Sequence, residues 1–268
     1  MILPHRLDPP QRPQMGLIVL QSDETIERDM RRLIPTDATL YVTRVPSAAH
    51  VSSETLAAMR RHLSTAAGLF PQTAAFSVVG YGCTSASAEI GSAEVAATIR
   101  RGCETGAVTE PLTATLAACL ALNVRRIAML SPYLPSVSDR LVASLEAGGV
   151  EVTGVASFEQ SEEHAVACID AASILAGAQA LASNTRADAL FLSCTNLRTL
   201  SAIDTIEAET GLAVLSSNQV LAWDMLRHAG IVVAKGPGKL WSAKSSLLRS
   251  PKHSLAEGRP AGRRWPRS

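Results

Sequence analysis

The sequence predicts an α/β protein with two pseudo-symmetric lobes, each a parallel sheet flanked by helices. Short β-type runs such as GLIVL, FSVVGYG and ALFLSC alternate with alanine-rich stretches of helical length, a pattern typical of parallel strands joined by crossover helices. A weak internal repeat adds to this. The interval from Gly16, where one strand begins, to Cys83 equals the interval from Ile127, where another begins, to Cys194. The two halves therefore match in register.

Each predicted element has a local reason. The strand candidates are short apolar runs bounded by polar or glycine-containing turns, and in chain order they span 16–20, 39–45, 76–82, 124–130, 149–158, 189–194 and 212–217. Helices are predicted over 51–70 and 131–149. The second of these is entered from a proline-containing loop and ends at two glycines, which are typical helix boundaries.

The repeat also predicts how the chain is divided. We expect a flexible N-terminus over 1–14, a first lobe formed by 15–112 plus 215–234, and a second lobe formed by 113–214. Residues 235–268 are basic and rich in Pro, Gly and Ser, a composition typical of a disordered tail. Two facing lobes of this kind place the active site in the cleft between them.

Composition limits the possible functions. The chain has 268 residues with 47% hydrophobic content, enough for a large core, and its net charge of +1 predicts no specific nucleic-acid partner. No run of apolar residues is long enough for a membrane span. Five cysteines without a Cys-x-x-Cys pair indicate neither a disulfide framework nor a metal site, so we expect a cytoplasmic protein with reduced thiols and a small-molecule ligand. Assembly into a homo-oligomer is left open.

Cys83 and Cys194 are the candidate reactive groups, because each directly follows an apolar strand. Ligands of open α/β sheets bind at the carboxyl ends of strands, and a helix that starts there favours a thiolate and lowers a cysteine pKa. The alternative is that both are small buried core residues. The following polar residues, which could hold a substrate carboxylate through their N–H groups, are Thr84, Ser85, Thr195 and Asn196. Cys103, Cys119 and Cys168 are assigned to packing, so Cys83 or Cys194 should be the first thiol to react with alkylating reagents.

The segment GYGCTS also invites comparison with a dinucleotide-binding loop. Its sixth position is Ser85, where that fingerprint needs glycine or alanine. Phosphate-binding and metalloprotease motifs are not found either. The sequence therefore predicts chemistry without a cofactor or metal.

Several segments together resemble one family. The stretches GYGCTSASAEIG, RRIAMLSPYLPSVSDRL, LFLSCTNLRTLSAIDTIEAETG and VLSSNQVLAWDMLRHAGI resemble the maleate cis-trans isomerase and arylmalonate decarboxylase branch of the aspartate/glutamate racemase superfamily. Within that branch, the amino-acid sequence of these segments most resembles the ectoine-utilisation protein A group. This resemblance implies a two-lobed fold with one active site between the lobes and two cysteines acting on opposite faces of an intermediate.

Roles follow from the resemblance residue by residue. It implies that Cys83 and Cys194 are the two catalytic cysteines and that Tyr133 hydrogen-bonds a substrate carboxylate. It also implies that a polar turn lines the site, formed by Ser216, Ser217 and Asn218.

The sequence departs from the maleate isomerase pattern by adding acidic residues. The first loop carries Asp23, and the start of a second-lobe helix carries Glu163. Negative charge disfavours a dicarboxylate and favours a substrate with an amino group. For Asp23, capping of the following helix is an equally good interpretation, and for Glu163 so is a solvated helix start.

The sequence thus predicts a cofactor-independent isomerase or racemase acting at a carbon adjacent to a carboxylate. The substrate class indicated is an amino acid or an ectoine-derived diamino acid. Cis-trans isomerisation of a maleate-type alkene and decarboxylation of an arylmalonate-type acid remain alternatives. A non-catalytic small-molecule-binding regulatory protein is the alternative from a different class.

Overall fold

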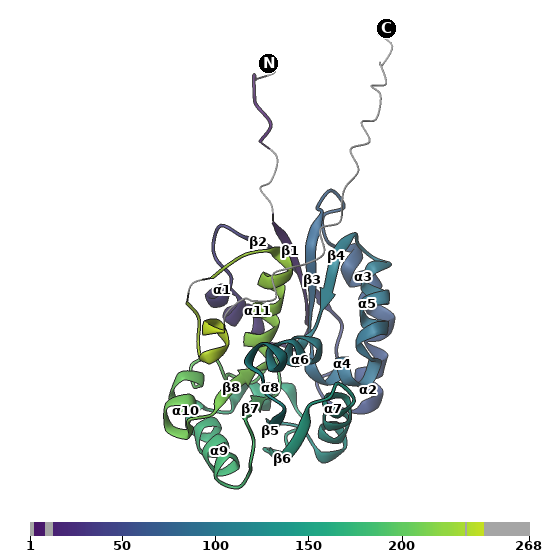
Figure 1. Cartoon of the computed structure of the whole chain (residues 1–268). Coiled ribbons are helices and arrows are strands. Elements are labelled where there is room, and N and C mark those ends of the chain that lie inside the picture. Colours follow the sequence, from purple (N-terminus) through teal and green to yellow (C-terminus); the bar gives the residue numbers. More distant parts are fainter. Residues whose placement is uncertain (1–2, 9–12, 234, 244–268) are drawn as a thin grey trace.

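Two parallel four-stranded sheets form the framework of the protein (Figure 1). The computed structural model describes residues 3–8, 13–233 and 235–243. The first sheet has the order β2-β1-β3-β4 and the second has the order β6-β5-β7-β8, so the repeat is present in the strand connections. Their bounds are β1 Gln14–Leu20, β2 Thr39–Val45, β3 Phe76–Gly82, β4 Thr105–Thr109, β5 Arg126–Ser131, β6 Glu151–Ser157, β7 Ala189–Leu192 and β8 Ala213–Ser216. The predicted fold class is confirmed.

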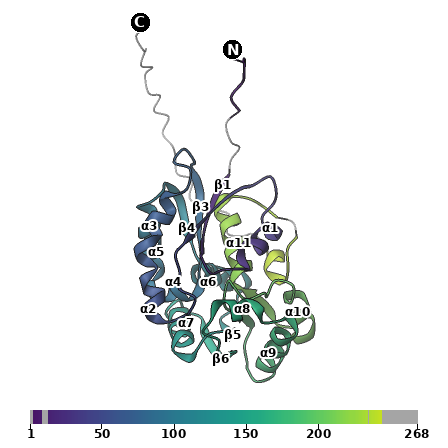
Figure 2. The same cartoon turned by 180° about the vertical axis from the view of Figure 1, so that it is seen from behind.

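Helices cover both faces of each sheet. Helices α3 and α5 lie on one face of the first sheet and α1 and α11 on the other, whereas α7 and α9 flank the second sheet (Figures 1 and 2). The helices are α1 Ile26–Leu33, α2 Ser53–Ala58, α3 Arg60–Gly68, α4 Thr84–Ile90, α5 Ser92–Arg100, α6 Pro111–Leu122, α7 Pro135–Ala147, α8 Glu163–Cys168, α9 Ala171–Ser183, α10 Ile203–Thr210, α11 Ser217–Ala229 and the 3₁₀ helix η1 Lys239–Ser242. The helix expected over 51–70 is divided in two, because the Met59 N–H bonds to Leu56, three residues back, in a tighter turn.

Two helices join the lobes. Helix α11 starts directly after β8 of the second sheet and packs against β3, α1 and α6, while α6 contacts both α4 and α7. These helices touch elements of both sheets, so the boundaries proposed near 113 and 215 stay predictions.

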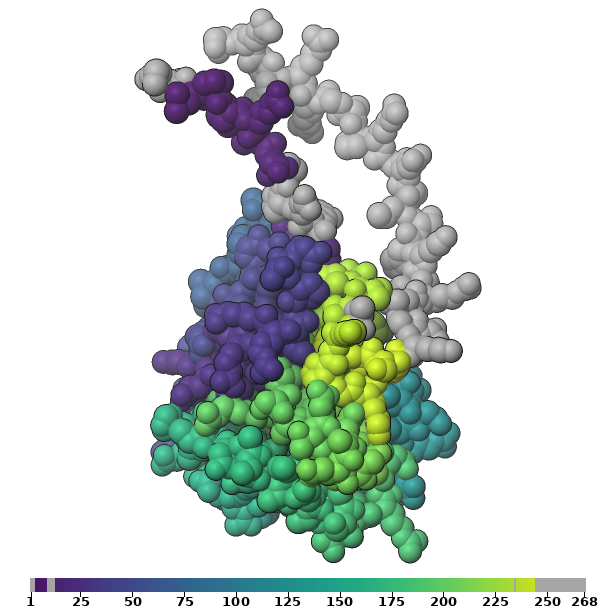
Figure 3. All heavy atoms as spheres, turned by 90° about the vertical axis from the view of Figure 1, so that its left-hand side faces the viewer, coloured from purple at the N-terminus to yellow at the C-terminus, as the bar shows by residue number. Residues whose placement is uncertain are grey.

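Both predicted terminal segments are shorter than expected. Strand β1 begins at Gln14, which is buried and pairs with neighbours in β2 and β3. Near the other end, η1 buries Leu240, and the Gln219 side chain donates to the Pro237 carbonyl at 2.7 Å. This packed part is the yellow segment that lies against the green second-lobe residues in Figure 3. One apolar anchor and a few backbone hydrogen bonds outweigh the polar composition there, and residues 244–268 of the predicted tail lie outside the described residues.

The glycines of GYG allow close packing next to Cys83. A Cβ atom added at Gly82 would lie 2.5 Å from Cδ1 of Ile26 in α1, and one added at Gly80 would lie 2.6 Å from Sδ of Met225 in α11. Strand β3 is buried along almost its whole length. These glycines therefore let α1 and α11 approach the strand that carries Cys83. Among the described residues, no helix has the length and hydrophobicity that crossing a membrane requires.

This packing predicts the effect of one added methyl group. Gly82→Ala should destabilise the protein by about 1–3 kcal/mol, because the methyl group must displace Ile26. Gly68→Ala is the matched control: its Cβ would meet only a carbonyl oxygen at 3.8 Å, and it should raise stability by about 0.4–1 kcal/mol. Urea unfolding measures both. Equal stabilities for the two variants would contradict the close approach of α1.

Candidate active site

Cys83 lies at the junction of β3 and α4. It is the N-cap residue of α4, and its Sγ accepts the Ala86 N–H at 3.3 Å, in the way that the hydroxyl of an N-cap serine does. The Ser85 hydroxyl lies 3.7 Å from the same sulfur. Cys83 is only 3% exposed. The strand end therefore presents a thiol with two nearby donors inside the protein.

Cys194 follows β7 but does not start a helix, which corrects the sequence prediction. The next helix, α10, begins only at Ile203. Cys194 instead has φ of 134°, a conformation that costs a non-glycine residue about 1–3 kcal/mol. Its Sγ accepts the Asn196 N–H at 3.3 Å, and the residue is 3% exposed. Tertiary contacts thus hold a strained turn where the repeat predicts a helix terminus.

A shared hydroxyl connects the two cysteine segments. Ser217 Oγ, at the start of α11, accepts hydrogen bonds from Thr84 Oγ1 at 2.8 Å and from the Cys194 N–H at 3.0 Å. The Thr195 hydroxyl in turn donates to the Gly82 carbonyl at 3.3 Å. The structure therefore brings the two cysteine turns from opposite lobes together, as the repeat predicts.

Burial controls the protonation of both thiols. Burial raises the pKa of Cys83 to about 12; the Ala86 N–H and Ser85 lower it in part, and the charge of Glu163 raises it. The pKa of Cys194 is raised well above its usual value, again mainly by burial. The expected low pKa is therefore wrong for this enclosed arrangement, because loss of water outweighs the donors at the strand ends. For the same reason neither thiol should react first with an alkylating reagent.

Tyr133 lies beside both cysteines. Its backbone N–H donates to Ser131 Oγ at 3.0 Å, and its carbonyl accepts a hydrogen bond from the Ser157 hydroxyl. The phenol is buried, which raises its pKa, and the nearby Cys194 and Cys83 thiols raise it further. A hydrogen bond from Tyr133 lowers the pKa of Cys194. The resemblance therefore located a residue of the site.

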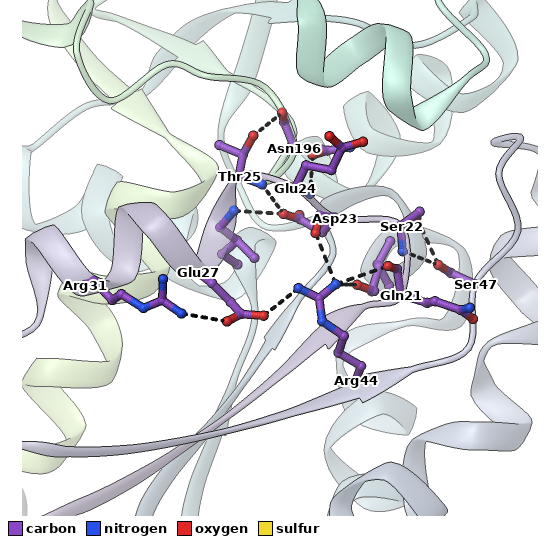
Figure 4. Close-up of polar contacts among 12 residues, drawn as sticks. Gln21, Ser22, Asp23, Glu24, Thr25, Glu27, Arg31, Arg44, Ser47 and Asn196 are labelled. Carbon is purple, nitrogen blue, oxygen red and sulfur yellow. Dashed lines mark hydrogen bonds and ion pairs between the residues drawn. The ribbon is translucent and has the colours of Figure 1, made fainter.

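Asp23 lies in the loop between β1 and α1, shown in Figure 4. Its Oδ1 accepts the N–H groups of Thr25 and Ile26, both at 2.8 Å, so it caps the start of α1. Its Oδ2 is buried and has no hydrogen-bond partner among the described residues. Thr195 is close enough to lower the pKa of Asp23, but burial has the larger effect and raises it.

Arg44 fixes the backbone of the same loop. Its Nη1 donates to the carbonyls of Leu20, Gln21 and Asp23 at 2.9, 3.1 and 3.1 Å, and its other nitrogen pairs with Glu27 (Figure 4). A planar guanidinium suits such a set of acceptors. The position of Asp23 is thus fixed by strand β2, which carries Arg44, as well as by its own helix. The sequence pattern contains no signal for this contact.

Asn196 holds the site together rather than presenting a free amide. Its Oδ1 accepts the Glu24 N–H, and its Nδ2 donates to the carbonyl and to Oε2 of Glu163, each at 2.9 Å. Both ends of the side-chain amide are therefore occupied within the protein, and the predicted binding of a substrate at Asn196 stays a prediction. Glu163 is only 6% exposed, and burial raises its pKa to about 7. The solvated interpretation of Glu163 is excluded by that burial.

The amide of Asn218 also has a structural role. Nδ2 donates to Asp29 Oδ2 at 2.9 Å and to the Thr195 carbonyl at 2.8 Å, and Ser216 caps α11 by accepting the Gln219 N–H. The Nδ2 group of Asn218 is therefore occupied within the protein, and the expectation that Asn218 lines the substrate site stays a prediction. Through the Thr195 carbonyl, the Asn218 side chain supports the loop that follows Cys194.

Asp29 is a buried acid that sequence reasoning missed. It lies on the inner face of α1 and is 1% exposed. Neither Asp29 Oδ1 nor Asn218 Oδ1 finds a donor within the part of the chain that the structure describes. One proton on the Asp29 carboxyl would satisfy both oxygens, as in an amide and carboxylic acid pair. The spacing of α1 gave a signal, since a charged residue stands on the same helix face as Ile26, Met30 and Leu33.

A family model described as Amdase, arylmalonate decarboxylase, matches residues 92–241, more than half of the chain. The chain belongs to the arylmalonate decarboxylase family. The arylmalonate decarboxylase of Bordetella bronchiseptica is 35% identical over 127 residues, which cover 47% of this chain and 53% of that enzyme. The predicted branch of the racemase superfamily is confirmed at this level.

Maleate isomerases are relatives along almost the whole length. The enzyme of Nocardia farcinica (strain IFM 10152) is 29% identical over 250 residues, covering 88% of this chain and 98% of the enzyme. A solved mutant of the Nocardia farcinica maleate cis-trans isomerase, with a covalently bound succinylcysteine intermediate, matches with a TM-score of 0.73 and 29% identity over 85% of this chain and 97% of that chain. The prediction of an enzyme related to maleate isomerases is confirmed. The similarity to ectoine-utilisation proteins stays a prediction.

The Asp29–Asn218 pair predicts a pH dependence of stability. Burial raises the pKa of Asp29 above its ordinary value of 3.8, although Asn218 and neighbouring arginines oppose this. The contribution of the protonated form is fully present below pH 3.8 and is lost as the pH rises through the folded-state pKa. Asp29→Asn keeps the shape and both hydrogen bonds without a charge. We expect the stability of wild type relative to Asp29→Asn to fall as the pH rises.

Urea unfolding of both proteins from about pH 4 to about pH 8 measures this difference. The comparison between the two proteins cancels the titration of Asp23 and Glu163, which both share. If the free energy of unfolding of wild type instead rose relative to that of the variant as the pH rises, Asp29 would act as an ionised partner of Asn218.

Proposed function

We propose that this chain is a cofactor-independent isomerase that acts at a carbon adjacent to a carboxylate, with Cys83 and Cys194 as the paired acid and base. The observation that carries this proposal is the convergence of the two cysteine turns, one from each lobe, on the hydroxyl of Ser217. The Thr84 hydroxyl, next to Cys83, and the backbone N–H of Cys194 both donate to it, and both thiols are buried. Two acid–base groups on opposite faces of one carbon allow a proton to leave on one side and return on the other.

The main chemical difficulty is the weak acidity of such a C–H bond. Removal of the proton places negative charge on the carboxylate as an enolate, which donors around the site must stabilise. Tyr133, Ser85 and Thr195 are buried next to the cysteines and carry hydroxyl groups for this purpose. We assign them to the substrate carboxylate together with backbone N–H groups of the two cysteine turns.

The acidic side chains support an amino group on the substrate. Asp23 has a buried oxygen without a partner, and Glu163 lies close enough to raise the pKa of both thiols. A substrate ammonium group placed between them would offset this negative charge and lower both thiol pKa values. Binding of the correct substrate would then generate the base. An amino acid fits this site, and an ectoine-derived diamino acid is the candidate that the family resemblance suggests.

Cis-trans isomerisation is the second candidate, favoured by the full-length relatives named as maleate isomerases. In that reaction a cysteine adds covalently to an alkene, the single bond rotates, and the thiolate leaves. Asp23 and Glu163 disfavour a dicarboxylate such as maleate. Decarboxylation of a malonate is the corresponding alternative from the family model, and a binding protein without chemistry remains the alternative from another class.

Substitution of the cysteines tests the reaction. Single enantiomers of amino acids in deuterium oxide should exchange the α-hydrogen and racemise without an added cofactor. Cys83→Ser and Cys194→Ser should each lower racemisation by roughly 100- to 10,000-fold, because each removes one acid–base group. One of the two variants should retain exchange from its intact face. Cys103→Ser, a partly buried cysteine outside the site, is the control and should remain active.

The same assay separates the alternatives. If maleate is turned over and no amino acid is, the proposed substrate class is wrong, while the proposed role of the two cysteines stands. Carbon dioxide release from a malonate would favour decarboxylation. Binding of a panel of carboxylates without exchange or turnover would favour the regulatory alternative.

The acidic residue of the first loop tests substrate charge. Asp23→Asn keeps the cap of α1 through its side-chain oxygen but removes the negative charge near the thiols. We expect kcat/KM for amine-bearing substrates to fall about 10-fold or more relative to a substrate without the amine. Steady-state kinetics on matched pairs, with and without the amino group, measures this. An equal loss for both members of each pair would contradict recognition of the amine by Asp23.

A further inference from the structure

A group of three polar side chains that includes a cysteine lies on the surface at the border of the two lobes. His164 and Cys168 are one turn apart in α8, and the His164 Nε2 lies 3.7 Å from Cys168 Sγ. The other ring nitrogen, Nδ1, lies 2.8 Å from Oε1 of Glu24 in the first lobe. Cys168 is exposed, and the His164 side chain is 77% exposed. The assignment of Cys168 to packing is therefore wrong.

The carboxylate of Glu24, the imidazole of His164 and the thiol of Cys168 lie in the sequence acid, base, nucleophile that is found around activated nucleophiles. A carboxylate accepts hydrogen bonds and does not donate them, so Glu24 favours the imidazole tautomer with its proton on Nδ1. This leaves Nε2 as an acceptor facing the thiol. A base that is oriented by an acid and faces a nucleophile is the arrangement used in thiol and hydroxyl activation.

Metal binding does not explain the cluster. The imidazole ring lies between its two partners, with one nitrogen facing each, so Cys168 and Glu24 do not converge on one point. The described residues contain no group of three His, Cys, Asp or Glu side chains that could hold a metal ion.

We propose that Cys168, His164 and Glu24 form a reactive-thiol site that is modified by small disulfides. Cys168 Sγ attacks one sulfur of the disulfide, a new S–S bond forms and the original S–S bond breaks. The Cys168 proton passes to His164 Nε2 and then to the departing thiolate, so a mixed disulfide and one free thiol result. The site is distinct from the paired cysteines, which are enclosed in the protein.

The position of this site links it to the interior. His164 directly follows Glu163, and the Glu24 N–H donates to Asn196, which in turn holds Glu163. A group attached to Cys168 is therefore bound beside the contacts that hold the buried acidic side chains. This inference does not depend on the reaction that the paired cysteines perform.

Reaction with oxidised glutathione tests the proposal. The full chain at neutral pH is followed by intact mass, and peptide mapping identifies the modified cysteine. Wild type should form a mixed disulfide at Cys168 before any other cysteine. His164→Ala and Glu24→Ala should each slow this reaction about fivefold or more, because they remove the base or its orientation.

The controls separate activation from exposure. His164→Ala uncovers Cys168, and Glu24→Ala removes a negative charge, so exposure and simple electrostatics both predict equal or faster reaction in these variants. Glu27→Ala removes a carboxylate that pairs with Arg31 and Arg44 instead and should leave the rate unchanged. His164→Gln keeps similar size without a basic nitrogen and should also be slow, which covers the case that the alanine variant does not fold.

Two results would overturn the proposal. One is an unchanged or faster reaction of Cys168 in folded His164 variants. The other is modification of Cys103 ahead of Cys168 in wild type, since Cys103 is partly buried and its thiol faces the Ile99 carbonyl at 3.8 Å rather than an imidazole.

Discussion

The hydroxyl of Ser217 is the contact on which the arrangement of the site depends. It accepts one hydrogen bond from the turn after Cys83 and one from the backbone of Cys194, so a single oxygen sets the spacing of two segments from different sheets. Ser217 is held in turn by α11, which leaves the second sheet and packs on the first. An unpaired buried donor costs about 1–3 kcal/mol. Loss of this oxygen would leave two such donors and release both cysteine turns.

Enclosure of the site makes ionisation of its acidic groups unfavourable. Two thiols and the carboxyls of Asp23, Asp29 and Glu163 are all buried, and burial raises the pKa of each of them. Burial therefore opposes ionisation of these groups at a place where the proposed chemistry needs a base. A positive group on the substrate is the change that would favour ionisation. For the amine-bearing substrate proposed above, discrimination among substrates and activation of the thiol would be one event, because both would follow from the same charge.

The sequence was informative where chemistry repeats along the chain and uninformative where contacts cross between elements. Strand periodicity and the matched position of the cysteines predicted both sheets and placed Cys83 near Cys194. The resemblance located Tyr133, and the added acidic residues located Asp23 and Glu163. By contrast, the hydrogen bonds of the Asn196 side-chain amide to Glu24 and Glu163 join three segments that meet only in the folded chain.

The two departures from the sequence pattern at the cysteines have a common physical origin. The helix predicted after Cys194 is replaced by a strained turn, and the low thiol pKa values are reversed by burial. The local sequence pattern predicts the properties of a strand end that faces water, as in an isolated sheet. Here a second lobe covers that strand end, and desolvation from this tertiary contact exceeds the local effect of helix N–H groups.

The repeat is conserved in chemistry more than in local structure. Cys83 receives the Ala86 N–H and the Ser85 hydroxyl at a helix start, whereas Cys194 receives the Asn196 N–H and the Tyr133 hydroxyl at a positive-φ turn. Each thiol thus has one backbone donor and one hydroxyl donor, and the charge of Glu163 raises the pKa of both. A reversible proton transfer through a carbon requires two groups of similar proton affinity, since a large difference would make one direction slow. In the proposed two-cysteine reaction, one backbone donor and one hydroxyl donor at each thiol would favour such a match.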